Sequence, residues 1–91
     1  MKYSVESVKY EIKITKQAQK DIKSLSPKQK EKLKWILSDL ISEDPYKGKK
    51  LLGELTGNYS FRLNIRDRII YSVDEKIKVI YVKRARAHYG Q

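Results

Sequence analysis

Residues 59–83 decide the fold of this chain, and they read YSFRLNIRDRIIYSVDEKIKVIYVK. Over residues 59–65, apolar side chains alternate with polar ones, which is the period of a strand with one buried face. Residues 68–73 and 77–83 are apolar on both faces, as expected for strands in the middle of a sheet. Asp74-Glu75 marks a tight turn between these two runs. We therefore predict three consecutive strands in this half of the chain.

The chain begins with a predicted strand and a predicted helix. Apolar residues alternate with charged ones over residues 8–14, which again indicates a half-buried strand. Thr15 is placed to cap a helix that follows. The apolar residues Ala18, Ile22 and Leu25 recur at the spacing of one helix face.

A second helix is predicted to begin at Ser26-Pro27-Lys28-Gln29. This run offers Ser as the N-cap, Pro as the first helical residue and Gln at the position that completes a capping box. Trp35 lies off the apolar stripe of this helix, and Pro45 ends the helical region. The stripe at helical spacing consists of Leu33, Ile36, Leu37, Leu40 and Ile41.

The order of the elements is β-α-α-β-β-β, which predicts an α+β fold: an antiparallel sheet with a helical pair packed on one face. We expect residues 1–91 to form a single domain, with residues 1–7 as an N-terminal extension or a continuation of the first strand. Residues 46–57 contain three glycines and three lysines among the positions between helix and sheet. They predict a loop whose backbone can approach a ligand closely, or a plain connector.

The charge balance favours an acidic partner. The chain carries 21 Lys and Arg against 11 Asp and Glu, a formal net charge of +10, which is typical of proteins that bind nucleic acid or an acidic protein. Cysteine is absent and there is one histidine, so zinc-thiolate and His-rich metal sites are excluded. We expect no metal and no cofactor. No apolar run approaches membrane-spanning length, and we expect a cytoplasmic protein without a membrane partner.

The single histidine, His88, stands beside Tyr89 and follows Arg84 and Arg86. Imidazole has an ordinary pKa of about 6.5 and carries protons at neutral pH, and arginines can hold a phosphate. Together they suggest chemistry on RNA or DNA. The alternative for His88 is a tail residue that only binds RNA.

Three blocks, residues 51–63, 67–71 and 84–89, carry a resemblance to a known family. They read LLGELTGNYSFRL, DRIIY and RARAHY. In this order they resemble the RelE/ParE superfamily of toxins from type II toxin–antitoxin systems, and the likeness extends over about residues 8 to 89. It implies a compact sheet, a cognate antitoxin as partner, and possible binding of operator DNA by the toxin–antitoxin complex. In the RelE and YoeB branch, the toxins cut messenger RNA on the ribosome.

The resemblance implies roles for the candidate site residues. Metal-free RNA cleavage needs a base at the 2′-oxygen, cations at the phosphate and an acid at the 5′-oxygen. His88 is the candidate acid, and Arg68 and Arg62 are candidates to stabilise the phosphorane. Tyr89 either orients the nucleotide by stacking or packs the tail against the sheet. Lys47, Arg84 and Arg86 are candidate RNA contacts.

The general base is open between Lys49, Lys50 and Glu54. YoeB-like proteins carry a Glu a few residues before the glycine block, where this chain has lysines, as RelE-like members do. A lysine base must lose its proton near neutral pH, which repulsion from neighbouring cations favours. Arg68 has an alternative as well, an ion pair with an acidic neighbour, Asp67 or Glu75.

Two other functions compete with the nuclease. A ParE-like toxin would inhibit DNA gyrase without chemistry, although that branch generally lacks the terminal His-Tyr that this chain has at His88-Tyr89. A plain RNA-binding module would also explain the charge. We expect the ribosome-dependent nuclease.

Overall fold

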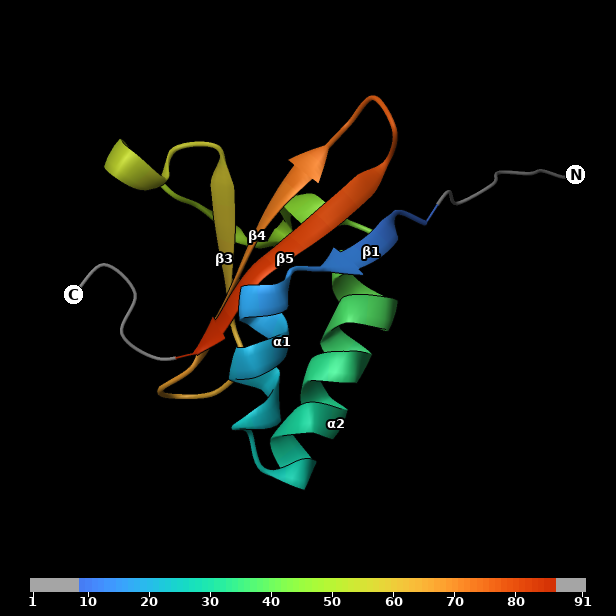
Figure 1. The fold of residues 1–91 in the computed structure, drawn as a ribbon. Helices are drawn as coiled ribbons and strands as arrows, with labels where there is room; N and C mark the ends of the chain where they lie inside the picture. Colours follow the sequence, from blue (N-terminus) through green and yellow to red (C-terminus); the bar gives the residue numbers. More distant parts are fainter. Residues whose placement is uncertain (1–8, 87–91) are drawn as a thin grey trace, which may run out of the picture.

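Five strands and two α-helices make up residues 9–86, the part of the chain that the computed structural model describes (Figure 1). In chain order they are β1 (Glu11–Ile14), α1 (Lys16–Lys23), α2 (Pro27–Trp35), β2 (Lys49–Lys50), β3 (Asn58–Arg62), β4 (Arg68–Asp74) and β5 (Val79–Arg86). The predicted order is confirmed, with β2 as an additional short strand. Val8 of the predicted first strand lies outside the described residues.

The strands form one sheet in the order β1-β5-β4-β3-β2. Neighbours from β2 to β5 pair antiparallel, as predicted. β1 differs, because it pairs parallel with β5 and makes the sheet mixed. Alternation of apolar and polar residues is the same for both strand directions, so the sequence pattern could not distinguish them.

Both helices begin at the predicted caps. The hydroxyl of Thr15 accepts a hydrogen bond from the N–H of Ala18 at 3.1 Å, and that of Ser26 accepts one from the N–H of Gln29 at 3.2 Å. The capping box is only half formed, because the side-chain oxygen of Gln29 instead accepts a hydrogen bond from Asn64 at 2.8 Å. This bond ties the start of α2 to the turn between β3 and β4.

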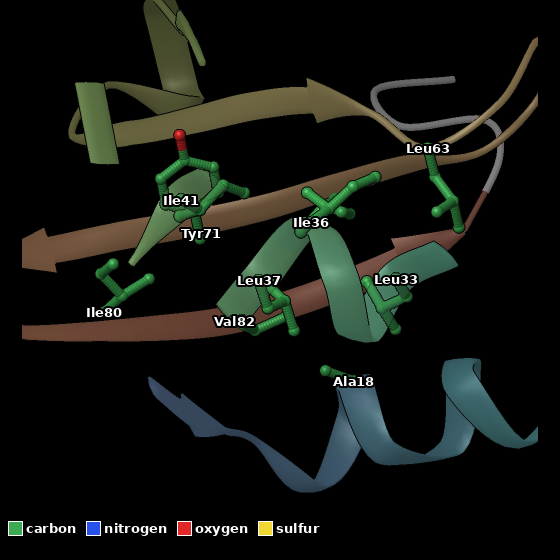
Figure 2. Close-up of a cluster of buried hydrophobic side chains, with 10 residues drawn as sticks. Ala18, Leu33, Ile36, Leu37, Ile41, Leu63, Tyr71, Ile80 and Val82 are labelled. Carbon is green, nitrogen blue, oxygen red and sulfur yellow. The ribbon is translucent and has the colours of Figure 1, made fainter. Parts of the chain in front are cut away.

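The core lies between the helices and one face of the sheet (Figure 2). α2 continues directly into π-helical turns over Ile36–Ile41. The predicted stripe faces the sheet, and Trp35, outside it, is 51% exposed. Burial of these aliphatic side chains supplies most of the driving force for folding. The fully or nearly fully buried members include Leu33, Ile36, Leu37 and Ile41 from the helical segment and Tyr71, Ile80 and Val82 from the sheet.

Residues 46–57 are more ordered than the predicted loop. They contain β2 and the short 3₁₀ helix Gly53–Leu55. Gly48 is needed for packing: a Cβ there would lie 3.0 Å from the carbonyl oxygen of Ser60 and would clash with the hydroxyl of Tyr71. That hydroxyl donates to the carbonyl of Pro45 at 2.6 Å, and burial raises the pKa of Tyr71 to about 12. Gly48 therefore has a packing role beside the core residue Tyr71.

Two predicted strand boundaries were wrong for the same physical reason. Ile65 is 91% exposed because the chain leaves β3 early. The side-chain oxygen of Asn64 accepts hydrogen bonds from the N–H groups of Arg66 and Asp67 and thereby turns the backbone. Asp74 does the same after β4. The turn there is thus longer than predicted, Ile77 is 59% exposed, and β5 starts at Val79.

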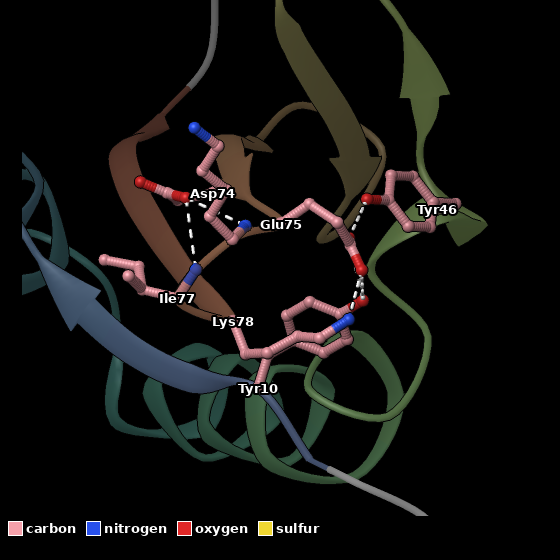
Figure 3. Close-up of polar contacts among 7 residues, drawn as sticks. Tyr10, Tyr46, Asp74, Glu75, Ile77 and Lys78 are labelled. Carbon is pink, nitrogen blue, oxygen red and sulfur yellow. Dashed lines mark hydrogen bonds and ion pairs between the residues drawn. The ribbon is translucent and has the colours of Figure 1, made fainter.

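Hydrogen bonds to Glu75 connect the β4–β5 turn to two segments that are distant in the sequence (Figure 3). The hydroxyl of Tyr10 donates to its two oxygens at 2.9 and 3.0 Å, and the Tyr46 hydroxyl and the Lys78 ammonium group donate to it as well. The Lys78 contact, followed by the two hydroxyls, lowers the pKa of Glu75 from its ordinary 4.5 to about 2. The same carboxylate raises the pKa of Tyr46.

This network predicts a pH-dependent stability. Because folding lowers the pKa of Glu75, its contribution is fully present above about pH 4.5 and is lost as the pH falls towards about 2. We expect Glu75→Gln to be less stable than wild type near neutral pH, with a difference that narrows in acid and in added salt. Urea unfolding across this range measures it. Glu54→Gln, at another exposed glutamate, is the control, and a difference independent of pH would contradict the assignment.

Candidate active site

The face of the sheet that the helices leave uncovered carries most of the candidate residues. Side chains alternate between the two faces of a strand, and residues paired across strands share a face. Tyr59, Phe61, Ile69 and Tyr71 point to the helices and contribute to the core. Their neighbours along β3 and β4 therefore point to the opposite side, which we call the open face. Its residues on β2 to β5 include Lys49, Ser60, Arg62, Arg68, Ile70, Ser72, Tyr81, Arg84 and Arg86.

Three arginines form a row across the open face. Arg62 pairs with Arg68 across β3 and β4, and Arg68 pairs with Arg86 across β4 and β5. The row lies where β3 and β5 end and β4 begins. Strands are spaced by about 4.8 Å, so the three arginines stand side by side at this end of the sheet. Arg86 also borders a larger cavity beside Asp21, whose pKa its charge helps to lower. Arg86 lies beyond the predicted strand over residues 77–83, but the structure includes it in β5.

Arg68 occupies the centre of this row and is half-buried. Its Nη1 donates a hydrogen bond to the hydroxyl of Ser60 at 3.2 Å. The alternative, an ion pair with Asp67 or Glu75, is not observed among residues 9–86: Asp67 accepts from Asn64, and Glu75 is bound as described above. The guanidinium group is thus oriented by a neutral partner.

A pocket of about 250 Å³ opens beside Arg68. The pairing of β2 with β3 sets its composition, because Lys49 is opposite Ser60 and so reaches the open face. Lys50 is opposite Tyr59, on the helix face. The structure therefore brings Lys49 and Arg68 together and separates them from Lys50. The pocket is lined by Lys49, Leu51, Leu55, Ser60, Arg68 and Ile70.

A β-bulge determines which way the arginines of β5 point. Tyr71 pairs with Val82, but the preceding residue, Ile70, pairs with Arg84, so Lys83 is an extra residue in β5. The extra residue shifts the alternation by one position. Val82 and Ala85 can both be buried in the core, and Arg84 and Arg86 both lie on the open face.

Beyond the end of β1, Asp21 on α1 provides the hydrogen-bond acceptor for β5 that a neighbouring strand would otherwise provide. Its carboxylate accepts the N–H of Ala85 at 3.0 Å and forms an ion pair with Nε of Arg84 at 2.9 Å. Burial opposes ionisation of Asp21, but the bonds from Arg84 and Ala85 outweigh it, so its pKa lies below the ordinary value. This contact attaches the first helix to the strand that carries the terminal arginines.

Removal of Asp21 is expected to destabilise the fold. The side chain of Asp21 is 8% exposed, and Asp21→Ala would leave a backbone N–H and a half-buried guanidinium group without this acceptor. We expect a loss of about 2–3 kcal/mol in the free energy of unfolding, measured by urea denaturation. Asp21→Asn keeps an acceptor and should lose less. Asp39→Ala, at an exposed aspartate in the π-helical turns Ile36–Ile41, is the control. An Asp21→Ala protein as stable as wild type would contradict this role.

Four sequence candidates remain: Lys47, Glu54, His88 and Tyr89. Lys47 is exposed in the 3₁₀ helix Pro45–Lys47, and Glu54 is exposed beside the pocket residue Leu55. His88 and Tyr89 lie outside the described residues. Sequence reasoning missed Ser60 and Asp21, whose roles come from pairing between distant segments. For Ser60, only its alternation with Phe61 could have indicated the face of the sheet on which it lies.

A larger cavity of about 760 Å³ lies between the α1–α2 turn and the β3–β4 turn. Arg86 borders it, but most of its polar wall is used to hold the two turns together: Asn64 bonds to both Gln29 and Asp67. The smaller pocket instead brings Lys49 and Arg68 together. Within residues 9–86, no cluster of three His, Asp or Glu side chains is arranged to hold a metal ion, and no helix is long and apolar enough to span a membrane.

Comparison with protein-family models and with curated proteins gives no match. Solved structures do match. A chain of the YoeB–YefM complex from Staphylococcus aureus is 32% identical over 88% of this chain and 98% of that one, with a TM-score of 0.64. A chain of the toxin–antitoxin complex RelBE2 from Mycobacterium tuberculosis is 25% identical over 91% and 95%, with a TM-score of 0.82.

A third similar structure is the archaeal RelE–RelB complex from Pyrococcus horikoshii, 28% identical to this chain over 91% of its length and 99% of the matched chain, with a TM-score of 0.65. Each of these likenesses covers most of the chain. They confirm the resemblance that the three sequence blocks indicated. The chain belongs to the RelE/YoeB superfamily of toxins from toxin–antitoxin systems.

Proposed function

We propose that this toxin is a ribosome-dependent, metal-independent endoribonuclease that cuts messenger RNA. The observation that supports this most is the arrangement on the open face, where Arg68, at the centre of the Arg62–Arg68–Arg86 row, lines the pocket that contains Lys49. A row of guanidinium groups matches the charge and geometry of a phosphodiester. An adjacent amine supplies a group that can accept a proton.

The reaction is an attack of the 2′-hydroxyl oxygen on the adjacent phosphorus. The bond from phosphorus to the 2′-oxygen forms and the bond to the 5′-oxygen breaks, which leaves a 2′,3′-cyclic phosphate and a 5′-hydroxyl. Lys49 in its neutral form takes the proton from the 2′-hydroxyl, and His88 delivers a proton to the leaving 5′-oxygen. Arg68 and Arg62 stabilise the charge that develops on the phosphorane oxygens.

Other cations position the RNA. Arg86 extends the row, Arg84 is fixed at the side of β5 by Asp21, and Lys47 lies just before β2. Contacts of this kind with phosphates set affinity and register rather than sequence preference. Tyr89 is assigned to orienting the nucleotide at the scissile bond. The ribosome would present the messenger strand in the extended form that the open face can bind.

We also propose a cognate antitoxin as the restraining partner. The RelBE2 and YoeB–YefM structures are toxin–antitoxin complexes, and the archaeal RelE structure is a complex with RelB. A net charge of +10 favours an acidic, disordered antitoxin segment that folds on this surface. Operator DNA is the further partner that we propose for the toxin–antitoxin complex.

The test is primer-extension mapping of a defined messenger RNA in a cell-free translation reaction. Wild-type protein should produce cuts in phase with codons, and only when ribosomes are present. His88→Ala should lose the cuts if His88 is the acid. Intact RNA with a folded wild-type protein would overturn the nuclease proposal, and gyrase supercoiling in the presence of the toxin would then test inhibition without chemistry.

A further inference from the structure

The open face holds one aromatic side chain among the strand residues of the described chain, Tyr81 on β5. Tyr59, Phe61 and Tyr71 are on the helix face and pack in the core. Tyr81 pairs with Ser72, which in turn pairs with Asn58, both on the open face. It is only half-buried although β5 is an interior strand, between β1 and β4.

Tyr81 lies one cross-strand row beyond the pocket. Along β4, the residues of the open face run from Arg68 through Ile70 to Ser72, the partner of Tyr81. Four residues of a strand correspond to about 13 Å, so Tyr81 is close to Arg68 but too far to contact the same phosphate. On its other side Tyr81 pairs with Lys13 of β1, which is exposed.

We propose that Tyr81 is a stacking platform for a base of single-stranded RNA, next to the nucleotide whose phosphate lies over the arginine row. This inference rests on the proposed function for the position of that phosphate. The face offers cations at both ends, Arg68 and Lys13, with an aromatic ring between them. This combination is how proteins bind single strands: charges follow the backbone, and aromatic rings receive bases.

The role assigned to Tyr81 is positioning rather than chemistry. Stacking would hold the messenger strand so that the reactive 2′-hydroxyl stays over the pocket, and it would tolerate any base because every base has a π face. An acidic protein segment would use the cations of this face but would gain little from a lone ring. For this reason we assign the ring to RNA.

The test is binding of a short, fluorescently labelled single-stranded RNA whose 2′-hydroxyls are methylated so that it cannot be cut. We expect Tyr81→Ala to weaken the affinity about 5- to 100-fold, while Tyr81→Phe, which keeps the ring, stays near wild type. Thermal unfolding checks the fold, and Tyr81→Thr, a good strand former, replaces the alanine variant if that one is unstable.

Two controls separate stacking from charge. Arg68→Ala should reduce the salt dependence of binding, whereas Tyr81→Ala should leave that dependence unchanged. An abasic nucleotide at the stacked position should weaken wild-type binding but should not weaken Tyr81→Ala further, because the same contact is already lost. If an abasic nucleotide weakened the binding of Tyr81→Ala as much as that of wild type at every position, the proposal would be overturned.

The outcomes distinguish this inference from the proposed nuclease. If RNA binding depends on the ring but wild-type protein leaves messenger RNA intact on ribosomes, the platform stands and the nuclease fails. If wild type cuts RNA but Tyr81→Ala binds and cuts equally well, the nuclease stands and the platform fails. If Tyr81→Ala bound RNA as tightly as wild type but bound an acidic antitoxin peptide more weakly, the platform would also be overturned. Where both hold, Tyr81→Ala should raise KM more than it lowers kcat.

Discussion

Arg68→Ala is expected to lower the rate of ribosome-dependent messenger RNA cleavage by about 100-fold or more, corresponding to about 3 kcal/mol of lost transition-state stabilisation. Arg68 is at the centre of the arginine row, beside the pocket, and its guanidinium group is held by Ser60. It is paired with no carboxylate among residues 9–86, so its removal leaves no buried charge behind. The loss should therefore appear in cleavage and not in the urea midpoint.

Two variants sharpen this prediction. Arg66→Ala removes an arginine that is two residues away but exposed in the β3–β4 turn, and it should cut RNA at close to the wild-type rate. Arg68→Lys keeps the charge but loses the planar fork that binds two phosphate oxygens, so it should recover only part of the activity. If Arg68→Ala cut RNA as fast as wild type, the arginine row would not be the catalytic phosphate site.

Lys49→Ala is expected to reduce cleavage by about 100-fold or more, the usual effect of removing a general base, whereas Lys50→Ala should remain close to wild type. The two lysines are adjacent in the sequence and equally charged. They differ in the face to which β2 directs them, because Lys49 lines the pocket and Lys50 is opposite Tyr59. Lys50→Ala is thus a matched control for charge and location in the chain.

The role of Lys49 as a base can be separated from simple phosphate binding. Lys49→Arg retains the positive charge but has no neutral form near physiological pH, so it should stay inactive if Lys49 accepts the proton. Restored cleavage in Lys49→Arg would show that charge alone is needed. Glu54→Gln tests the remaining candidate base. Loss of cleavage in Lys50→Ala or Glu54→Gln, with activity kept in Lys49→Ala, would contradict the assignment.

Much of the fold could be predicted from local signals. The caps at Thr15 and Ser26 and the apolar stripe from Leu33 to Ile41 are features of neighbouring residues, and the structure confirms them. The four predicted strands were also located correctly, apart from their ends, whereas β2 was placed in a loop. Those ends depend on side chains such as Asn64 and Asp74 that bind their own backbone, a signal that alternation of apolar residues does not include.

The site could be predicted only in part, because it depends on pairing. The sequence identified Arg62, Arg68 and Arg86 as candidates but could not show that they form one row, since strand register is set by the whole sheet. It could not choose between Lys49 and Lys50 either, because it placed both in a loop. The bulge at Lys83 has no local signature, although it decides where Arg84 and Arg86 point.

The chemical ends of the cut messenger RNA test the central claim most directly. Ribosome-programmed RNA would be treated with wild-type protein, and the fragments would be analysed for their terminal groups. Attack by the 2′-hydroxyl predicts a 2′,3′-cyclic phosphate or its hydrolysis product on the upstream fragment and a 5′-hydroxyl on the downstream one. A 2′-deoxynucleotide at the cut site should then block cleavage. A 3′-hydroxyl with a 5′-phosphate, or cleavage that tolerates the deoxynucleotide, would contradict the account.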